Sequence, residues 1–101
     1  MIKHIVMWDV RGDTVEAKRL AAADLKRRFE ELVGKIPGLI HLEVGIDVSR
    51  ASYACDVVLY SEFTDQAALA AYADHPAHLA VRDALKDVRV SRYQVDYAPA
   101  A

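Results

Sequence analysis

The sequence predicts one small α+β domain of ferredoxin-like type, spanning residues 1–101. Two observations lead to this prediction. Segments with strand and helix periodicity follow one another in the order β-α-β-β-α-β, which is the order of the split βαβ motif. The first and third predicted strands are apolar on both faces, as the two central strands of that four-stranded antiparallel sheet should be. The helices then cover one face of the sheet.

The composition describes a chain that can bury a modest core and that carries little net charge. Of its 101 residues, 53% are apolar and 28% are charged, so the chain is expected to fold. Its 13 basic and 15 acidic residues give a formal net charge of −2. A nucleic-acid-binding protein or a protein attracted to anionic lipid would show a basic surplus, so neither partner is expected.

Three features of the sequence predict a cytoplasmic protein. Cys55 is the one cysteine, so no internal disulfide can form, and its apolar surroundings predict a small buried side chain. The apolar run that begins at Ile2 ends at Asp9 and is too short for a secretory signal. No segment approaches the roughly 20 apolar residues of a membrane span.

The first third of the chain contains a predicted strand and a predicted helix. Residues 2–10 form the strand because β-branched and aromatic side chains dominate them and a turn follows at residues 11–13. Residues 14–34 form the helix, with Asp13 or Thr14 as the N-cap and a glycine at the end. Its apolar stripe consists of Val15, Ala22, Leu25, Phe29, Leu32, Val33 and Ile36.

The middle of the chain contains two further predicted strands. Residues 39–48 alternate between apolar and polar side chains, so one face is expected in the core. After a short loop, residues 53–63 form a strand whose centre is apolar on both faces. The face of the earlier strand that is expected in the core holds Ile40, Leu42, Val44, Ile46 and Val48.

The last third contains an interrupted helix and the final strand. Asp65 is the expected N-cap of a helix that runs to residue 73. Pro76 interrupts this helix and suits the first position of a second helical piece over residues 77–86. Residues 88–97 form the last predicted strand.

The predicted topology leaves one face of the sheet without cover from this chain. Both helical segments pack on the same face, whereas the central strands are apolar on both faces. An apolar patch of that size usually marks an interface, and a second sheet is its simplest cover, since sheets pack about 10 Å apart. The sequence therefore predicts a two-fold homodimer formed through the open face of the sheet.

Six segments of the sequence carry a family resemblance. They are residues 2–8 (IKHIVMW), 36–39 (IPGL), 42–45 (LEVG), 56–63 (DVVLYSEF), 71–78 (AYADHPAH) and 95–97 (VDY). In this order they are similar to segments of the stress-responsive dimeric α/β-barrel family, known as Dabb. The most specific is residues 71–78, which resembles that family's signature of a tyrosine followed by HPxH.

The resemblance implies a ferredoxin-like dimer whose two sheets form a barrel-like core, a dimeric α/β barrel. It implies less about activity, because most bacterial members of the family have no assigned one. One plant member is a polyketide cyclase that closes an aromatic ring by aldol chemistry without a cofactor. Its catalytic tyrosine and histidine match Tyr72 and His78, and a histidine near its pocket matches His4. Its third-strand histidine has no match here, because this chain has Asp56 and Val57 at that place.

The residues themselves support the same chemistry. His78 lies in the first turn of a helix, whose positive end disfavours a protonated imidazole, so a neutral imidazole there can act as a general base. Tyr72, on the preceding helical segment, can donate a hydrogen bond to a developing enolate oxygen. Together they can remove a proton next to a carbonyl without a metal or a nucleotide. The structural alternative is that Tyr72 is a core aromatic with its hydroxyl at the rim.

The other candidate residues also have two interpretations. His75 is a candidate substrate contact, and its alternative is to bond free backbone groups at the helix break. The pair His75 and His78 has a spacing that suits a metal, but the proline between them and the lack of a third ligand argue against one. His4 is a third candidate catalytic residue, or else a core or interface histidine. Trp8 and Phe29 are candidate substrate contacts, and their alternative is the core.

Three functions are compatible with these observations. The first is a cofactor-free lyase, cyclase or isomerase for a small apolar carbonyl compound, with His78 as the base and Tyr72 and His4 orienting the substrate. The second is a module that binds a small hydrophobic molecule without turnover. The third is a dimeric stress protein whose role is assembly or stability. A cavity of about 300 Å³ or more, with Tyr72 and His78 pointing inward, would favour the first two. No cofactor is expected in any of them.

Overall fold

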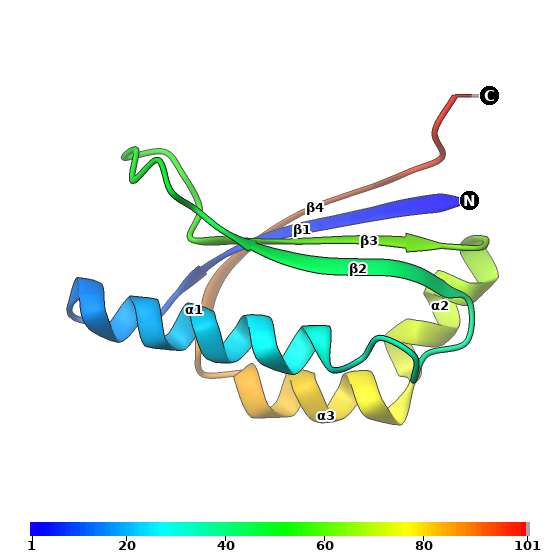
Figure 1. Ribbon diagram of the computed structural model, residues 1–101, viewed down its shortest axis with the longest axis horizontal. Coiled ribbons are helices and arrows are strands. Elements are labelled where there is room, and N and C mark those ends of the chain that lie inside the picture. The colour runs from blue at the N-terminus through cyan, green and yellow to red at the C-terminus, as the bar shows by residue number, and fades with distance from the viewer. Residues whose placement is uncertain (101) are drawn as a thin grey trace.

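A computed structural model describes residues 1–100, and in these residues it shows four strands and three helices (Figure 1). In chain order the elements are β1 (Ile2–Val10), α1 (Val15–Glu30), β2 (Leu39–Ile46), β3 (Val57–Phe63), α2 (Gln66–Asp74), α3 (Pro76–Leu85) and β4 (Arg89–Tyr97). All three helices lie on one side of the sheet, and the loop between β2 and β3 rises from the other side (Figure 1).

The four strands form one sheet in the order β2-β3-β1-β4, and every neighbouring pair is antiparallel. β1 and β3 are therefore the central strands, and β2 and β4 are the edges. In this register His4 on β1 lies opposite Ser61 on β3 and Asp96 on β4. The predicted ferredoxin-like fold class, with the first and third strands in the middle, is confirmed.

The core fills the space between the sheet and the helices. Alternate residues of β1 and β3 point into it, because successive side chains of a strand point to opposite faces. α1 contributes Leu25 and Phe29, and α3 contributes Leu85. The side chains that are at most 2% exposed include Val6, Trp8, Val10, Leu25, Phe29, Leu59, Phe63 and Leu85.

Capping side chains fix the start of each helix. Thr14 and Asp65 are the N-caps of α1 and α2, and each accepts a hydrogen bond from the backbone N–H three residues later. His75 caps α3 through Nδ1, which accepts a hydrogen bond from the N–H of Ala77 at 3.0 Å. Pro76 follows at the first position of α3, where its missing N–H costs nothing. The corner between α2 and α3 is therefore set by local sequence.

The first helix is shorter than its periodicity predicts. α1 ends at Glu30 rather than Gly34, because the N–H groups of Leu32 and Val33 bond to carbonyls three residues back and a turn follows. Gly34 ends that turn with a φ of +84°, a conformation that favours glycine. Two residues of the predicted apolar stripe are exposed, so the prediction is wrong for them. Val33 lies beyond the end of α1 and is 56% exposed, and Val15, in the first turn, is 80% exposed.

The second strand departs from its predicted pattern at both ends. A β-bulge near its start turns Ile40 out of the core, and that side chain is exposed. The strand ends at Ile46 rather than residue 48, because Asp47 accepts hydrogen bonds from the next backbone N–H groups and closes a turn. Val48, which was predicted to face the core, is exposed instead.

The third strand begins at Val57 rather than residue 53, because the preceding segment is a loop held by Asp56. The buried carboxylate of Asp56 accepts a hydrogen bond from the N–H of Val10 at 2.9 Å, and the Lys18 ammonium lies 3.4 Å away. Cys55 lies in this loop and is partly exposed, so the prediction of a buried cysteine is wrong.

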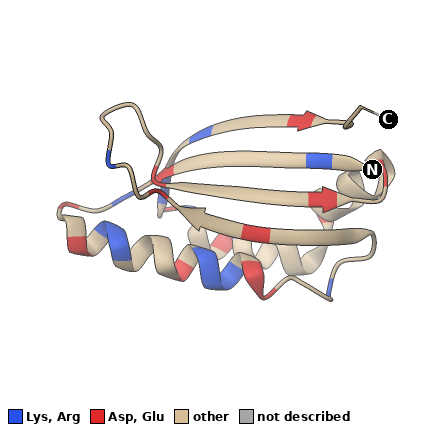
Figure 2. Ribbon diagram, turned by 45° about the horizontal axis from the view of Figure 1, so that its top comes forward, with Lys and Arg blue, Asp and Glu red and all other residues tan. Residues whose placement is uncertain are grey.

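Charged residues are densest on α1, and the strands carry fewer of them (Figure 2). The basic run on α1 is paired with carboxylates of the same helix: Lys26 with Glu30 at 2.7 Å, and Arg28 with Asp24 at 2.9 Å. These pairs make a solvated, charged helix face. Within residues 1–100, no helix has the length and the apolar character needed to span a bilayer.

Candidate functional site

A cavity of about 440 Å³ lies between the α2–α3 pair and the β1–β4 edge of the sheet, and we name it the α2–α3 cavity. Its wall includes Leu69, Ala70, Tyr72 and Ala73 from α2, His78 and Arg82 from α3, His4 from β1, and Arg92, Gln94 and Asp96 from β4. The space exists because the helix-facing positions of β4 are polar and partly solvated, so no apolar side chain fills it. Its lining combines an apolar floor with a charged rim.

The three predicted catalytic residues meet in this cavity, and Tyr72 is their centre. Its ring centroid lies 4.2 Å from that of His78 and 6.2 Å from that of His4, and it also contacts Phe63 at 5.1 Å. Tyr72 is 3% exposed, and its hydroxyl is buried without a hydrogen-bond partner among residues 1–100. Burial raises the pKa of this phenol, so the hydroxyl stays protonated and can donate.

His78 is held in one orientation by the end of the preceding helix. Its Nδ1 lies 3.1 Å from the carbonyl oxygen of Ala73, and a carbonyl can only accept, so Nδ1 carries the proton in that bond. Burial is the main cause that lowers the pKa of His78. A neutral imidazole with its proton on Nδ1 leaves the lone pair of Nε2 free to take up a proton.

A chain of polar contacts runs along the edge strand into the cavity. The Nδ1–H of His4 donates to Asp96 at 2.5 Å, and the amide of Gln94 donates to Asp96 at 2.9 Å. The guanidinium of Arg92 donates in turn to the amide oxygen of Gln94. Asp96 therefore fixes the tautomer of His4 and directs its Nε2 away from β4. Sequence reasoning missed all three β4 residues, although their alternate spacing shows that they share one face.

The structure places the three predicted substrate contacts outside the lining of this cavity. Trp8 and Phe29 are buried in the core, where their rings stack at a centroid distance of 5.3 Å and an interplanar angle of 21°. His75 caps α3 at the outer corner of the helix pair. These surroundings match the alternative interpretations, which are a place in the core for Trp8 and Phe29 and a cap at the helix break for His75. A contact of these residues with substrate stays a prediction.

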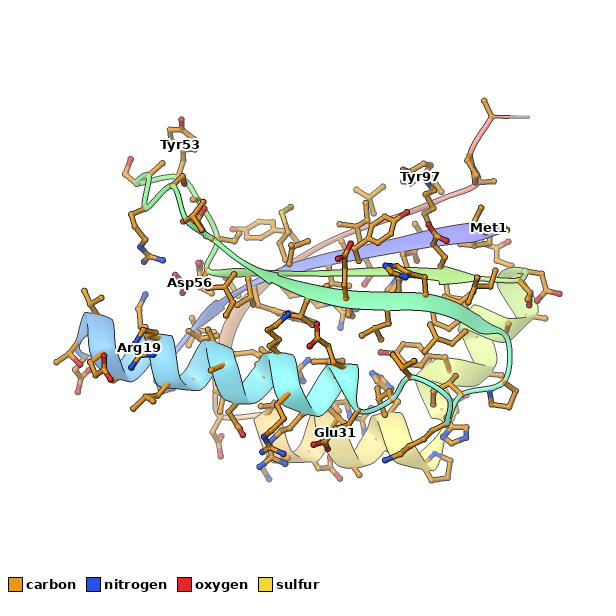
Figure 3. All side chains as sticks on the ribbon, viewed as in Figure 1. Met1, Arg19, Glu31, Tyr53, Asp56 and Tyr97 are labelled. Atoms are coloured by element: carbon orange, nitrogen blue, oxygen red, sulfur yellow. The ribbon has the colours of Figure 1, made fainter. Side chains whose placement is uncertain are left out.

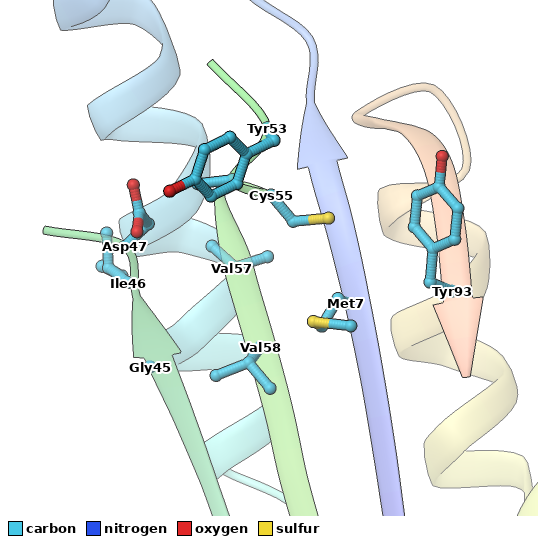
Figure 4. Close-up of a pocket in the computed structure, with 10 residues that line it drawn as sticks. Met7, Gly45, Ile46, Asp47, Tyr53, Cys55, Val57, Val58 and Tyr93 are labelled. Carbon is cyan, nitrogen blue, oxygen red and sulfur yellow. The ribbon is translucent and has the colours of Figure 1, made fainter. Parts of the chain in front are cut away.

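A second hollow, of about 560 Å³, lies on the open face of the sheet under the β2–β3 loop. Met7, Val58 and Tyr93 come from three neighbouring strands and form its floor (Figure 4). Tyr53, at the tip of the loop, and Tyr97, on β4, also point away from the helices (Figure 3). This hollow is larger than the α2–α3 cavity, and the carboxylate in its lining, Asp47, already accepts hydrogen bonds from the N–H groups of Ser49 and Arg50. Its chemistry is therefore mainly that of an apolar contact surface.

Metal ligands are not grouped in the described part of the chain. Within residues 1–100 no cluster of three or more His, Cys, Asp or Glu side chains is placed to hold an ion. His75 and His78 each use Nδ1 in a backbone hydrogen bond at the helix corner.

The fold and the cavity together define a ferredoxin-like α+β protein with a polar pocket under its helix pair. The model of one family, the stress responsive A/B barrel domain (Dabb), matches residues 2–99. This chain therefore belongs to the Dabb family. No curated protein sequence matches the chain.

Solved structures resemble the chain over nearly its whole length. A dimeric protein of unknown function with a ferredoxin-like fold from Bacteroides fragilis is 35% identical, with a TM-score of 0.84 over 95% of this chain and 93% of that one. A Dabb family protein from Mesorhizobium loti is 27% identical, with a TM-score of 0.73 over 99% and 97%. A hydroxynitrile lyase from Passiflora edulis is only 13% identical over 95% and 90%, with a TM-score of 0.78, so it shows a shared fold alone.

Proposed function

We propose that the chain acts as one domain that binds a small, largely apolar carbonyl compound in the α2–α3 cavity and removes a proton next to the carbonyl without a cofactor. The observation that carries this proposal is the unpaired hydroxyl of Tyr72, which is buried next to His78. A buried donor without a partner costs about 1–3 kcal/mol, and the carbonyl oxygen of a bound compound would recover that cost. The apolar floor of the cavity suits the rest of such a molecule.

The proposed step uses the two side chains in different roles. The Nε2 lone pair of His78 takes the proton from the carbon next to the carbonyl, and the electron pair of the broken C–H bond moves onto the carbonyl oxygen. Tyr72 donates a hydrogen bond to the enolate oxygen that forms. His4, fixed by Asp96, orients the compound from the β1 side. In a cyclase the enolate carbon then attacks a second carbonyl, whose π electrons move to its oxygen, and that oxygen takes the proton back from His78. In an isomerase His78 returns the proton to a different atom of the enolate.

A homodimer through the open face of the sheet completes the proposal. The apolar hollow on that face supports it, and the Bacteroides fragilis relative is dimeric. Val95 lies on the same face of β4 and is 58% exposed. Sedimentation equilibrium at micromolar concentration should give a dimer for the wild type and a monomer for Val95→Asp, whereas a monomeric wild type would overturn the proposal. A cytoplasmic location stays a prediction.

Proton removal can be measured without knowing the natural substrate. We expect the protein to accelerate exchange of the α-protons of 4-phenylbutan-2-one for deuterium in D₂O, followed by NMR. His78→Ala should reduce this rate about 10²–10⁴-fold, because it removes the base. Tyr72→Phe should reduce it about 10²-fold, because it removes the donor to the enolate. Arg27→Ala, on the solvent face of α1, is the control and should leave the rate unchanged.

Two results would reject parts of this proposal. Exchange that continues unchanged in His78→Ala would show that His78 is not the base. Binding of the ketone without any exchange in the wild type would reject catalysis and favour the alternative function, a non-catalytic small-molecule-binding homodimer.

A further inference from the structure

Two arginines line the α2–α3 cavity, and a third lies beside them. Arg82 on α3 and Arg92 on β4 belong to its lining. Arg89, at the start of β4, lies beside them with its guanidinium 5.1 Å from the centre of the Trp8 ring. Burial is the main cause that lowers the pKa of Arg89, and the positive charges of Arg92 and Arg82 lower it further. The charges of Arg82 and Arg92 therefore both act on the guanidinium of Arg89.

Carboxylates of the chain do little to balance this charge. Among residues 1–100, Arg89 and Arg92 form no ion pair, and Arg82 has only Asp83, its neighbour on the same helix, at 4.0 Å. Arg92 donates to an amide oxygen instead, which carries no charge. The cavity lining contains two arginines and a single carboxylate, Asp96, so it keeps one net positive charge while its histidines are neutral.

From this arrangement we infer that the natural substrate carries one carboxylate, which Arg82 and Arg92 bind at the mouth of the cavity while its carbonyl lies at Tyr72 and His78. The inference rests on the proposed function and refines its substrate class from an apolar carbonyl compound to a small oxo acid. A guanidinium matches a carboxylate with two parallel hydrogen bonds, which gives both energy and orientation. A single negative charge also balances the two arginines and one carboxylate that line the cavity.

The two ends of such a substrate would serve different steps. The arginine end supplies binding energy and holds the molecule in one direction, so that its α-carbon is presented to His78 rather than to solvent. The carboxylate also supplies a charged partner for Arg92, which forms no ion pair within residues 1–100 and donates only to an amide oxygen. Binding should therefore weaken with added salt, because the rim of the cavity is open to solvent.

The test compares two molecules that differ only in charge. 4-Oxo-4-phenylbutanoate carries a ketone and a carboxylate, and 4-oxo-4-phenylbutanamide replaces the carboxylate with a neutral amide of the same shape. Calorimetric titration of the wild type should give a dissociation constant for the acid at least about tenfold lower than that for the amide. This is the difference in affinity expected for one charge-assisted pair. Arg82→Gln and Arg92→Gln should each remove most of that preference, because they weaken binding of the acid much more than binding of the amide. Arg19→Gln makes the same charge change on α1, away from the cavity, and should have no effect.

The outcomes separate this inference from the proposed function. Equal binding of acid and amide, with both weakened by Tyr72→Phe, would overturn the carboxylate and leave the carbonyl site standing. If the preference for the acid is lost in Arg82→Gln and Arg92→Gln, and Tyr72→Phe does not change the binding of either molecule, the carboxylate site is supported and the carbonyl site is rejected. A wild type that binds neither molecule would overturn both.

Discussion

One strand of this protein builds two different environments on the same face. β1 directs both Trp8 and His4 toward the helix layer, four residues apart. Trp8 stacks on Phe29 of α1 in a core that excludes water, whereas His4 faces Tyr72 and Asp96 at the edge of a cavity. The difference comes from the neighbours rather than from the strand, because α1 supplies an apolar stripe and β4 supplies polar side chains.

The comparison shows how a small sheet can keep both stability and a site. The α1 half fills its space with large apolar groups, which is the main source of stability in a domain of this size. The α2–α3 half leaves space and keeps a buried hydroxyl without a partner, which costs stability. Changes in the first half should therefore lower stability, and changes in the second should lower function and spare stability.

Truncation of the α1 side should have the largest effect on stability. Phe29 is 1% exposed, so Phe29→Ala should destabilise the protein by about 3–5 kcal/mol in urea denaturation, because it leaves a cavity against Trp8. Val33→Ala is the matched control from the same predicted stripe, and it should change stability by less than about 0.5 kcal/mol because Val33 is exposed. If both variants lost the same amount of unfolding free energy, Phe29 and Val33 would be equally buried, which would contradict the structure.

That control also shows how far sequence reasoning could reach. Periodicity placed all the strands and helices, and cap residues such as Asp65 marked where helices begin. It could not see the bulge that turns Ile40 outward, because an alternating pattern continues through an inserted residue without a visible break. The prediction that Val33 is buried was wrong for a similar reason, since the helical spacing of apolar residues continues in the sequence after the α-helix has ended.

The candidate site was predictable only in part. The motif with Tyr72 and His78 was recognised by its resemblance to a family, and the helix position of His78 supported its role. Asp96 and Arg92 were missed because the polar residues of a strand do not reveal which residues of the neighbouring strand they contact until the register is known. That register places Asp96 beside His4, 92 residues earlier in the chain. Long-range pairing of this kind has no local signal.

Removal of the Tyr72 hydroxyl should have the opposite effect to the core truncation, since it should lower activity and leave stability unchanged or raised. Tyr72→Phe keeps the ring and its contacts with Phe63 and His78 but removes a buried donor that has no partner. We expect the ligand-free variant to be as stable as the wild type or up to about 1 kcal/mol more stable in urea denaturation. It should be less active in the exchange assay, as expected where a site is kept at the expense of stability. A loss of more than about 1 kcal/mol would indicate that the hydroxyl is bonded in the native state.

The smallest expected effect is the dependence of stability on pH that His78 contributes. Burial lowers the pKa of His78 in the folded state, the bond to Ala73 opposes this, and the charges of Arg82, Arg89 and Arg92 lower it further. In the unfolded chain the imidazole titrates near 6.5, so the unfolded state binds this proton first as the pH falls. The contribution of His78 to stability is therefore constant above that pH and declines as the pH falls from 6.5 toward the folded pKa.

A matched variant isolates this contribution from the other titrating groups. The difference in unfolding free energy between the wild type and His78→Gln should be smaller at pH 5 than at pH 8, because all other groups are shared and their effects cancel in the difference. A difference that grows in acid would mean that the folded protein favours the protonated imidazole. His78 would then be a poor base at neutral pH, and the cavity would share the structural role of the α1 core rather than contrast with it.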